Sequence, residues 1–215
     1  MTAKKLTFFI VFIIIVVVIG WFLKKLNTPT SPHTIPSTLT FSGAGLSFTY
    51  HPNELTLSQQ NDSVVLHHEI PFENTGACDM MGDEKTYDTL TDFHVTRRIA
   101  STSLVQTVRQ MSSYIPEENF DGNVLKINPG FIDSFEAGLL KGFAIYEGAE
   151  GCGFTTYYFP ISGNRTLIIQ KESIQALSGV RGQEEVQRIL KVPGSIAPSV
   201  SDKIFKDILT SLTIK

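Results

Sequence analysis

The fold is decided by the stretch FTTYYFPISGNRTLIIQ, residues 154–170. Its two halves are rich in β-branched and aromatic residues, which strands favour, and the Ser-Gly-Asn triplet at 162–164 supplies a tight turn between them. The stretch therefore predicts a β-hairpin. Alternation places Tyr158 on the opposite face from Tyr157 and Phe159, so at least part of this aromatic group belongs to a hydrophobic core.

More strands are predicted on the N-terminal side of the hairpin. Residues 139–147 extend it into a meander, because they form another short run of strand-favouring residues. Alternating apolar and polar side chains predict four further strands, at residues 46–50, 55–57, 64–70 and 93–100. Strands at such short spacing favour an antiparallel sheet.

Three segments have the periodicity of helices. After Ser103, which with Gln106 fits a capping box, an apolar stripe predicts a helix near 104–111. Residues 184–192 predict a short helix, with acidic residues first and a basic residue last. Ser201 is predicted to cap a final helix, whose apolar stripe consists of Ile204, Phe205, Ile208, Leu209 and Leu212. Strands and helices do not alternate strictly, so we expect an α+β fold, an antiparallel sheet packed with a few helices.

A membrane anchor is predicted at the N-terminus. Residues 6–23 (LTFFIVFIIIVVVIGWFL) are an unbroken apolar run with two lysines on each side. As a helix the run would be about 27 Å long, close to the thickness of a bilayer's hydrocarbon core. A cleaved secretory signal is the alternative, but the run is long and does not end in small residues. We therefore expect a signal-anchor transmembrane helix in 1–25, a Pro/Ser/Thr-rich stalk in 26–40 and a folded domain in 41–215.

Charge and topology bear on the location of the domain. The lysines on the two sides of the anchor nearly cancel in the positive-inside rule. A long domain after a single N-terminal anchor is most often translocated, so we expect a single-pass protein of the cell membrane, held in the bilayer by residues 6–23, with its domain outside the cytoplasm. Beyond Lys25 lie all 21 acidic residues and 14 of the 18 basic ones, a net charge of −7. Such a charge repels phosphate backbones, so no nucleic-acid partner is expected.

The two cysteines of the chain, Cys78 and Cys152, predict a disulfide. A pair of cysteines in an exported domain is more often bonded than not. Cys78 follows Gly76-Ala77, and Cys152 lies between two glycines, so the backbone can adjust to the bond. Two separate buried thiols are the competing interpretation.

No catalytic, cofactor or metal site is predicted. The sequence has no G-x-S-x-G motif, and no serine has a histidine marked as its partner. In the strand 64–70, His67 and Glu69 share one face while His68 lies on the other with Val64, Leu66 and Ile70. Two ligands on one face do not make a metal site. The acidic residues Asp79, Asp83 and Glu84 are interpreted as a solvated loop.

The two ends of the domain resemble PsbP-like domains. Residues 45–52 (GLSFTYHP) are similar to the segment with which those domains begin, and 204–214 (IFKDILTSLTI) to their closing helix and short last strand. The middle, with Cys78-Asp79 and Gly151-Cys152-Gly153 before 157–160, resembles uncharacterised anchored proteins of small-genome bacteria. The resemblance implies an antiparallel sheet sandwiched by helices and a role in binding or assembly.

Two functions remain open on these grounds. The first is a membrane-anchored extracytoplasmic domain that binds or assembles an unidentified protein or other cell-envelope partner without catalysis, with no cofactor. An inert structural component of the envelope would have the same sequence features. The second is a metal-dependent or carboxylate-based surface enzyme, built from His67, Glu69 and the acidic loop.

Overall fold

The computed structural model describes residues 38–75, 78 and 86–215, all of which belong to one compact unit, Pro36–Lys215. The predicted anchor in 1–25, the stalk as far as residue 37 and the acidic residues Asp79, Asp83 and Glu84 lie outside the described residues. Within the described ranges, no helix is both long and apolar enough to cross a membrane.

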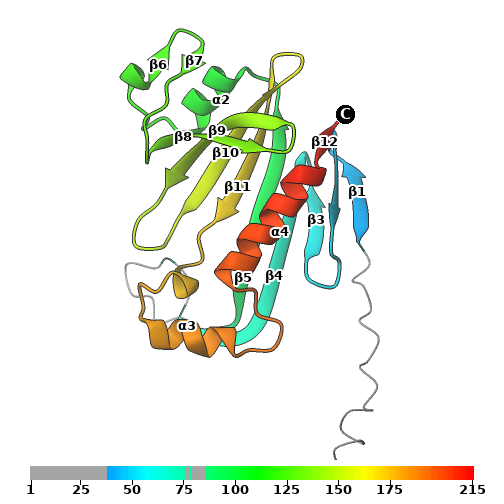
Figure 1. Ribbon diagram of the computed structural model, residues 1–215, viewed down its shortest axis with the longest axis vertical. Helices are drawn as coiled ribbons and strands as arrows, with labels where there is room; N and C mark the ends of the chain where they lie inside the picture. The colour runs from blue at the N-terminus through cyan, green and yellow to red at the C-terminus, as the bar shows by residue number, and fades with distance from the viewer. Residues whose placement is uncertain (1–37, 76–77, 79–85) are drawn as a thin grey trace, which may run out of the picture. The chain divides into compact units, whose positions relative to one another are not determined.

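The centre of the domain is a seven-stranded sheet, every neighbouring pair of which is antiparallel (Figure 1). The strand order is β3-β4-β5-β11-β10-β9-β8. The predicted hairpin is confirmed, because Phe154 pairs with Glu172 at one end and Ile161 with Arg165 at the turn. The strands are β3 (Thr56–Gln60), β4 (Ser63–Asn74), β5 (Tyr87–Ala100), β8 (Ile132–Ala137), β9 (Leu140–Glu147), β10 (Phe154–Ile161) and β11 (Arg165–Glu172).

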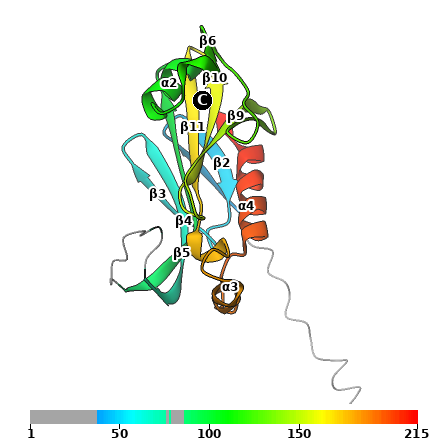
Figure 2. The same ribbon diagram turned by 90° about the vertical axis from the view of Figure 1, so that its left-hand side faces the viewer.

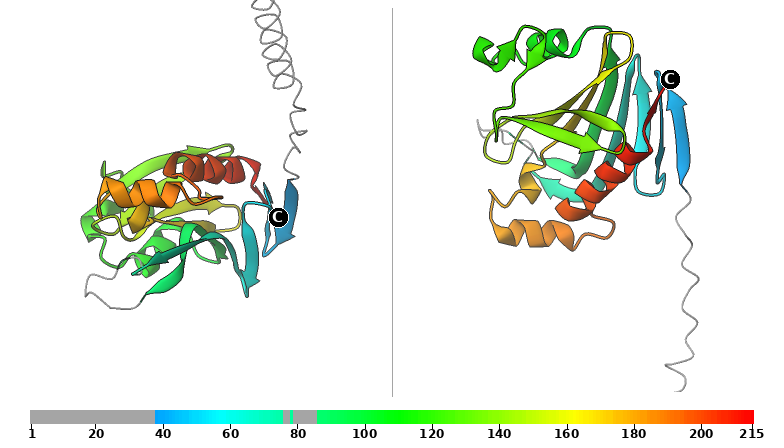
Figure 3. Two further views of the ribbon diagram at one scale, coloured as in Figure 1. Left: turned by 90° about the horizontal axis from the view of Figure 1, so that it is seen from below. Right: turned by 45° about the horizontal axis from the view of Figure 1, so that its top comes forward.

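A three-stranded sheet, in the order β1-β2-β12, lies beside the end of the last helix (Figure 3). It consists of β1 (Leu39–Gly43), β2 (Leu46–Tyr50) and β12 (Thr213–Ile214). β2 coincides with the predicted strand 46–50, whereas β1 begins at Leu39, within the last residues of the expected stalk. A small two-stranded sheet is formed by β6 (Phe120–Asp121) and β7 (Val124–Leu125).

The helices are α2 (Leu104–Met111), α3 (Gln183–Leu190) and α4 (Pro198–Ser211), with short 3₁₀ turns η1 (Glu117–Asn119) and η2 (Gln175–Leu177). The capping box of Ser103 and Gln106 is confirmed at the start of α2. The prediction that Ser201 caps the last helix is wrong. Pro198 is the first residue of α4, and Ser201 is buried within the helix. Proline at this position has φ already set for a helix and lacks an N–H that would need a partner.

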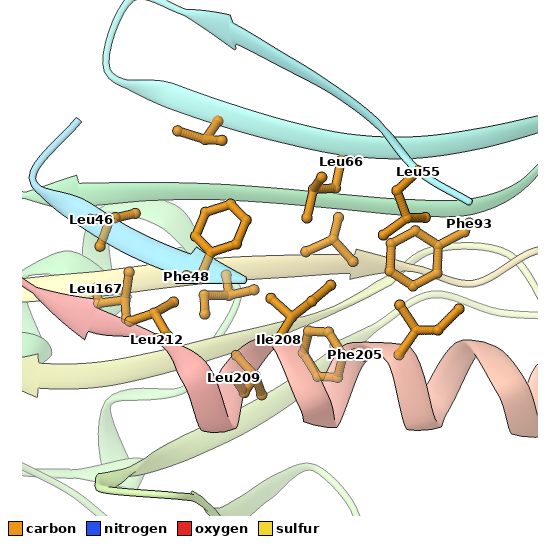
Figure 4. Packing of buried hydrophobic residues seen from close by; sticks show 14 of the residues in the cluster. Leu46, Phe48, Leu55, Leu66, Phe93, Leu167, Phe205, Ile208, Leu209 and Leu212 are labelled. Atoms are coloured by element: carbon orange, nitrogen blue, oxygen red, sulfur yellow. The ribbon is translucent and has the colours of Figure 1, made fainter. Parts of the chain in front are cut away.

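Helices cover both faces of the large sheet, as Figure 2 shows for α2 and α4. The stripe predicted for the last helix is buried and packs with β2 against one face, and in Figure 4 Phe48 and Ile208 point into the same space. The other face packs against α2 through Tyr158 and Ile168. At one end, α3 and η2 cover Ile70 and Leu90. The domain is thus an antiparallel sheet packed with a few helices, as predicted.

Candidate functional site

A cleft lies between the start of α4, the end of β11 and η2. In Figure 1 the start of α4 and the end of β11 lie toward the lower end of the sheet. Its volume is about 340 Å³. The lining combines hydroxyl and charged groups with apolar side chains, among them Thr155, Lys171, Asp202, Tyr157 and Leu177. Alternation along β10 and β11 aims Tyr157 and Lys171 at α4, because both lie on the face that this helix covers.

An ion pair joins β11 to α4 at the edge of the cleft. Lys171 Nζ donates to Asp202 Oδ1 over 2.7 Å, and the lysine side chain is 19% exposed against 65% for the aspartate. The pair therefore places a largely covered cation beside an accessible carboxylate. Burial, and secondly the charge of Asp202, raises the pKa of Tyr157, so its hydroxyl keeps its proton at neutral pH. The cleft can thus offer hydrogen-bond donors and charges of both signs.

A buried carboxylate, Asp92, also lines the cleft. It is the extra residue of a β-bulge, since His68 pairs with Phe93 while Glu69 pairs with Thr91. His68 Nδ1 lies 2.5 Å from Asp92 Oδ1, and the backbone N–H of Ile196 donates to Asp92 Oδ2 over 2.6 Å. Both carboxylate oxygens are therefore satisfied. Asp92 could not be recognised from the sequence, because a bulge breaks the alternation that marks buried strand positions.

His67, which was predicted to share a face of its strand with Glu69, lies on the face of the sheet opposite to α4. His67 pairs with His94, and His94 Nδ1 lies 2.6 Å from Glu172 Oε1. Glu69 is exposed. Among the described residues, no group of three histidine, cysteine, aspartate or glutamate side chains is placed to hold a metal ion. The described residues therefore do not supply a third metal ligand beside His67 and Glu69.

The two cysteines lie together next to the cleft. Cys78 is exposed and Cys152 is buried, and both are free thiols. Burial, and then a hydrogen bond with the Cys78 thiol, raises the pKa of Cys152 to about 11. The Cys78 backbone N–H donates to Gln175 Oε1 over 3.3 Å, while Gln175 Nε2 donates to the Glu150 carbonyl over 3.2 Å. The fold thus brings the predicted pair into contact, and the covalent bond between them stays a prediction.

One buried charge, Arg97 on β5, lies in the core between the sheet and β2. Its guanidinium carbon is 3.7 Å from the centre of the Phe48 ring, a cation–π contact. None of its three side-chain nitrogens has a hydrogen-bond partner among the described residues. Burial lowers the pKa of Arg97 to about 9. Arg97 was not predicted to be buried, although it alternates with Val95 and Ile99 on the predicted strand.

A second polar cluster lies on the other face, beneath α2. Ser112 Oγ donates to Glu147 Oε1 over 2.6 Å and lies 3.0 Å from the Tyr158 hydroxyl. Burial and a hydrogen bond to Glu147 raise the pKa of Tyr114. Because Ser112 and Tyr158 are both 0% exposed, a substrate cannot reach this serine. The cluster fastens α2 to the sheet.

No family model matches the sequence, and no curated protein matches it either. Among solved structures, the chain matches a crystal structure from Bacteroides thetaiotaomicron VPI-5482, with a TM-score of 0.40 and 10% identity. That similarity covers 83% of this chain and 48% of the other, so the chain spans about half the length of the protein it matches.

Proposed function

We propose that this chain is a single-pass membrane protein whose extracytoplasmic domain binds, or helps to assemble, a protein partner of the cell envelope. The proposal takes the anchor in residues 6–23 and the stalk from the sequence. The partner is expected to reach the domain near the membrane surface, since a stalk of this composition acts as a semi-rigid spacer.

The observation that carries the proposal is the cleft at the start of α4. Its volume of about 340 Å³ falls in the range of binding pockets, and its lining is mixed in the way that binding sites are. Lys171 and Asp202 offer both signs of charge, Tyr157 offers a hydroxyl, and Leu177 is among the apolar side chains of the lining. These groups suit a segment of polypeptide, which brings backbone donors and acceptors together with side chains.

A PsbP-like sandwich is part of the same proposal. The two segments that resemble those domains, 45–52 and 204–214, are neighbours in the fold, because Ser47 pairs with Thr213 and Leu46 with Ile214. Their contact supports the idea that the resemblance reflects one structural unit. PsbP-like domains act in binding or assembly, which agrees with the role proposed for the cleft.

Photo-cross-linking in intact membranes tests the cleft. A photoreactive residue replaces Ser173, which lines the cleft, in the full-length chain. The control replaces Val124, which is 60% exposed on β7 at the other end of the sheet. We expect one discrete protein adduct from position 173 and none from 124.

Charge variants decide whether that adduct depends on the cleft. Lys171→Met removes the cation of the cleft, and Lys141→Met removes a cation paired with Glu136 at 3.2 Å on an exposed hairpin. We expect the adduct from position 173 to fall about tenfold with Lys171→Met, the effect of losing one charged contact, and to stay unchanged with Lys141→Met. Equal adducts with both variants, or equal adducts from positions 173 and 124, would refute the proposal.

A carboxylate-based enzyme is the second candidate, favoured by the pair of His68 and Asp92. A buried carboxylate that holds one nitrogen of a histidine leaves the other nitrogen free to take a proton, as in a general base. If the domain hydrolyses any member of a panel of chromogenic esters and phosphoesters, His68→Gln should lower the rate about 100-fold or more. His67→Gln, on the opposite face, should not. The absence of turnover by the full-length protein would rule this candidate out.

A further inference from the structure

We propose that Cys78 and Cys152 are oxidised in a fixed order, with Cys78 reacting first, to a disulfide that fastens one wall of the cleft. The disulfide and the order in which the two thiols react are inferred from the contact between them. The consequence for binding rests on the proposed function of the cleft.

The contact between the thiols joins segments that are far apart in the sequence. Cys78 belongs to the region after β4, and Cys152 to the turn between β9 and β10. Gln175 of η2 receives the N–H of Cys78 and donates to the carbonyl of Glu150, so one side chain holds both segments. This arrangement positions the two sulfurs without help from the covalent bond.

Cys152 adjoins one wall of the cleft. Gly151, immediately before Cys152, lines the cleft together with Leu177 and Ser178, which follow Gln175. The two sides of this wall touch closely, since a Cβ added to Gly151 would lie 2.2 Å from Ser178 Oγ. Gly151 also has a φ of +77°, which favours glycine. A bond at Cys152 therefore restrains the wall directly.

The two thiols differ in accessibility, and this sets the order. Cys78 is exposed and Cys152 is buried, so an oxidant meets Cys78 first. Burial and the hydrogen bond with Cys78 raise the pKa of Cys152, which leaves little thiolate at neutral pH. Cys152 is consequently a poor first nucleophile, but it is in place to attack a sulfur at position 78.

The reaction is thiol–disulfide exchange with a small disulfide or an exported thiol oxidase as the oxidant. The Cys78 thiolate attacks one sulfur of the oxidant, forms a mixed disulfide and expels the first oxidant thiolate. Cys152 then loses its proton and attacks Cys78 Sγ, expelling the second thiolate. The protein loses two protons and two electrons, and the oxidant's disulfide becomes two thiols.

Intact mass spectrometry of the full-length, reduced protein in detergent tests the order. Oxidised glutathione is added, and remaining thiols are alkylated at intervals. We expect the wild type to lose both alkylation sites without retaining glutathione. Cys152→Ser should accumulate one glutathione on Cys78, and Cys78→Ser should react at Cys152 at least about tenfold more slowly, because Cys152 is buried and burial also keeps its thiolate fraction small. Equal rates for the two variants, or a wild type that stays fully alkylated, would overturn the proposal.

Amide hydrogen exchange tests the fastening of the wall without any partner. Oxidation should slow exchange at Leu177 and Ser178 by about tenfold in the wild type, because it restricts local opening, and should leave Cys78→Ser unchanged. Val124, at the other end of the sheet, serves as an internal control. If exchange at these residues is unchanged in a protein shown to be oxidised, the disulfide does not restrain the wall of the cleft.

Binding is tested last, with the cross-linker at Ser173. Oxidation should change the adduct yield by about fivefold or more if the wall and the partner are coupled. A yield that is the same in the oxidised and reduced forms contradicts the coupling. If neither form gives an adduct, the proposed function fails. The disulfide and its restraint of the wall are then judged by mass spectrometry and amide hydrogen exchange alone.

Discussion

Asp92 and Arg97 are two buried charges on the same strand, and their surroundings are opposite. The carboxylate of Asp92 meets an imidazole nitrogen of His68 and the backbone N–H of Ile196. The guanidinium of Arg97 meets the face of Phe48 and no hydrogen-bonding atom of the described residues. The loss of hydration is therefore offset at Asp92 by two hydrogen bonds, and at Arg97 only by a cation–π contact.

This difference shows that burial does not tell what a charge contributes to the fold. Asp92 connects β5, β4 and the segment that leads into α4, so its removal would leave donors from two other elements unpaired. Within the part of the chain that the structure describes, Arg97 connects nothing by hydrogen bonds, so an apolar side chain of similar volume could take its place. The first charge should stabilise the structure, and the second should weaken it relative to that apolar side chain.

The largest expected effect is that of Asp92→Ala. We expect the free energy of unfolding to fall by about 3–5 kcal/mol, because the change breaks a buried hydrogen-bonded group and leaves its donors without partners. Urea titration followed by circular dichroism measures it. Asp202→Ala, at an exposed carboxylate, is the control. A loss below about 1 kcal/mol at Asp92, within the range of surface changes, would show that this carboxylate does not hold the elements together.

Arg97→Met should have the opposite sign. We expect a gain of about 1–4 kcal/mol in the free energy of unfolding, as when other buried charges are replaced by apolar residues of similar volume. The same titration measures it. If the variant is instead less stable than the wild type, Arg97 has a counter-charge in solution and the contrast with Asp92 disappears.

The advantage of Arg97→Met should shrink at high pH. Burial lowers the pKa of Arg97 to about 9 in the folded state, from 12.5. Between these values the unfolded chain holds a proton that the folded protein releases, so the stability of the wild type rises with pH relative to the variant. From pH 8 to pH 10 the gap should narrow by about 1 kcal/mol. A gap that is constant over this range would contradict a lowered pKa.

The smallest effect is expected at the cleft. Lys171→Met removes a partly exposed ion pair, so it should change the free energy of unfolding by no more than about 1 kcal/mol. The change in the free energy of unfolding on loss of this pair is thus the reference for the changes at the two buried charges. A loss comparable to that of Asp92→Ala would place Lys171 among the groups that hold the fold together.

The parts of the fold that could be predicted from the sequence are those that follow a local periodicity. The hairpin 154–170 and the stripe of α4 follow from periodicities of two and 3.6 residues, which report local burial. The bulge at Asp92 interrupts such a period, and its partners His68 and Ile196 come from distant segments. The cleft is likewise assembled from β11, η2 and α4, whose approach no local pattern reveals. The contact of the cysteines was expected only from their number and the assumed compartment.

The position of β12 has a consequence for biosynthesis. β2 has β1 on one side and obtains its other neighbour only when Thr213 and Ile214 pair with it, while the N–H of Lys215 donates to the Gly45 carbonyl over 2.9 Å. A two-stranded hairpin alone is marginally stable. During synthesis from the N-terminus, β1 and β2 leave the ribosome early, and β2 lacks its second neighbour until β12 has been made. We therefore expect this corner of the domain to mature only after the ribosome has passed residue 214, and to depend until then on whatever protects nascent chains from aggregation.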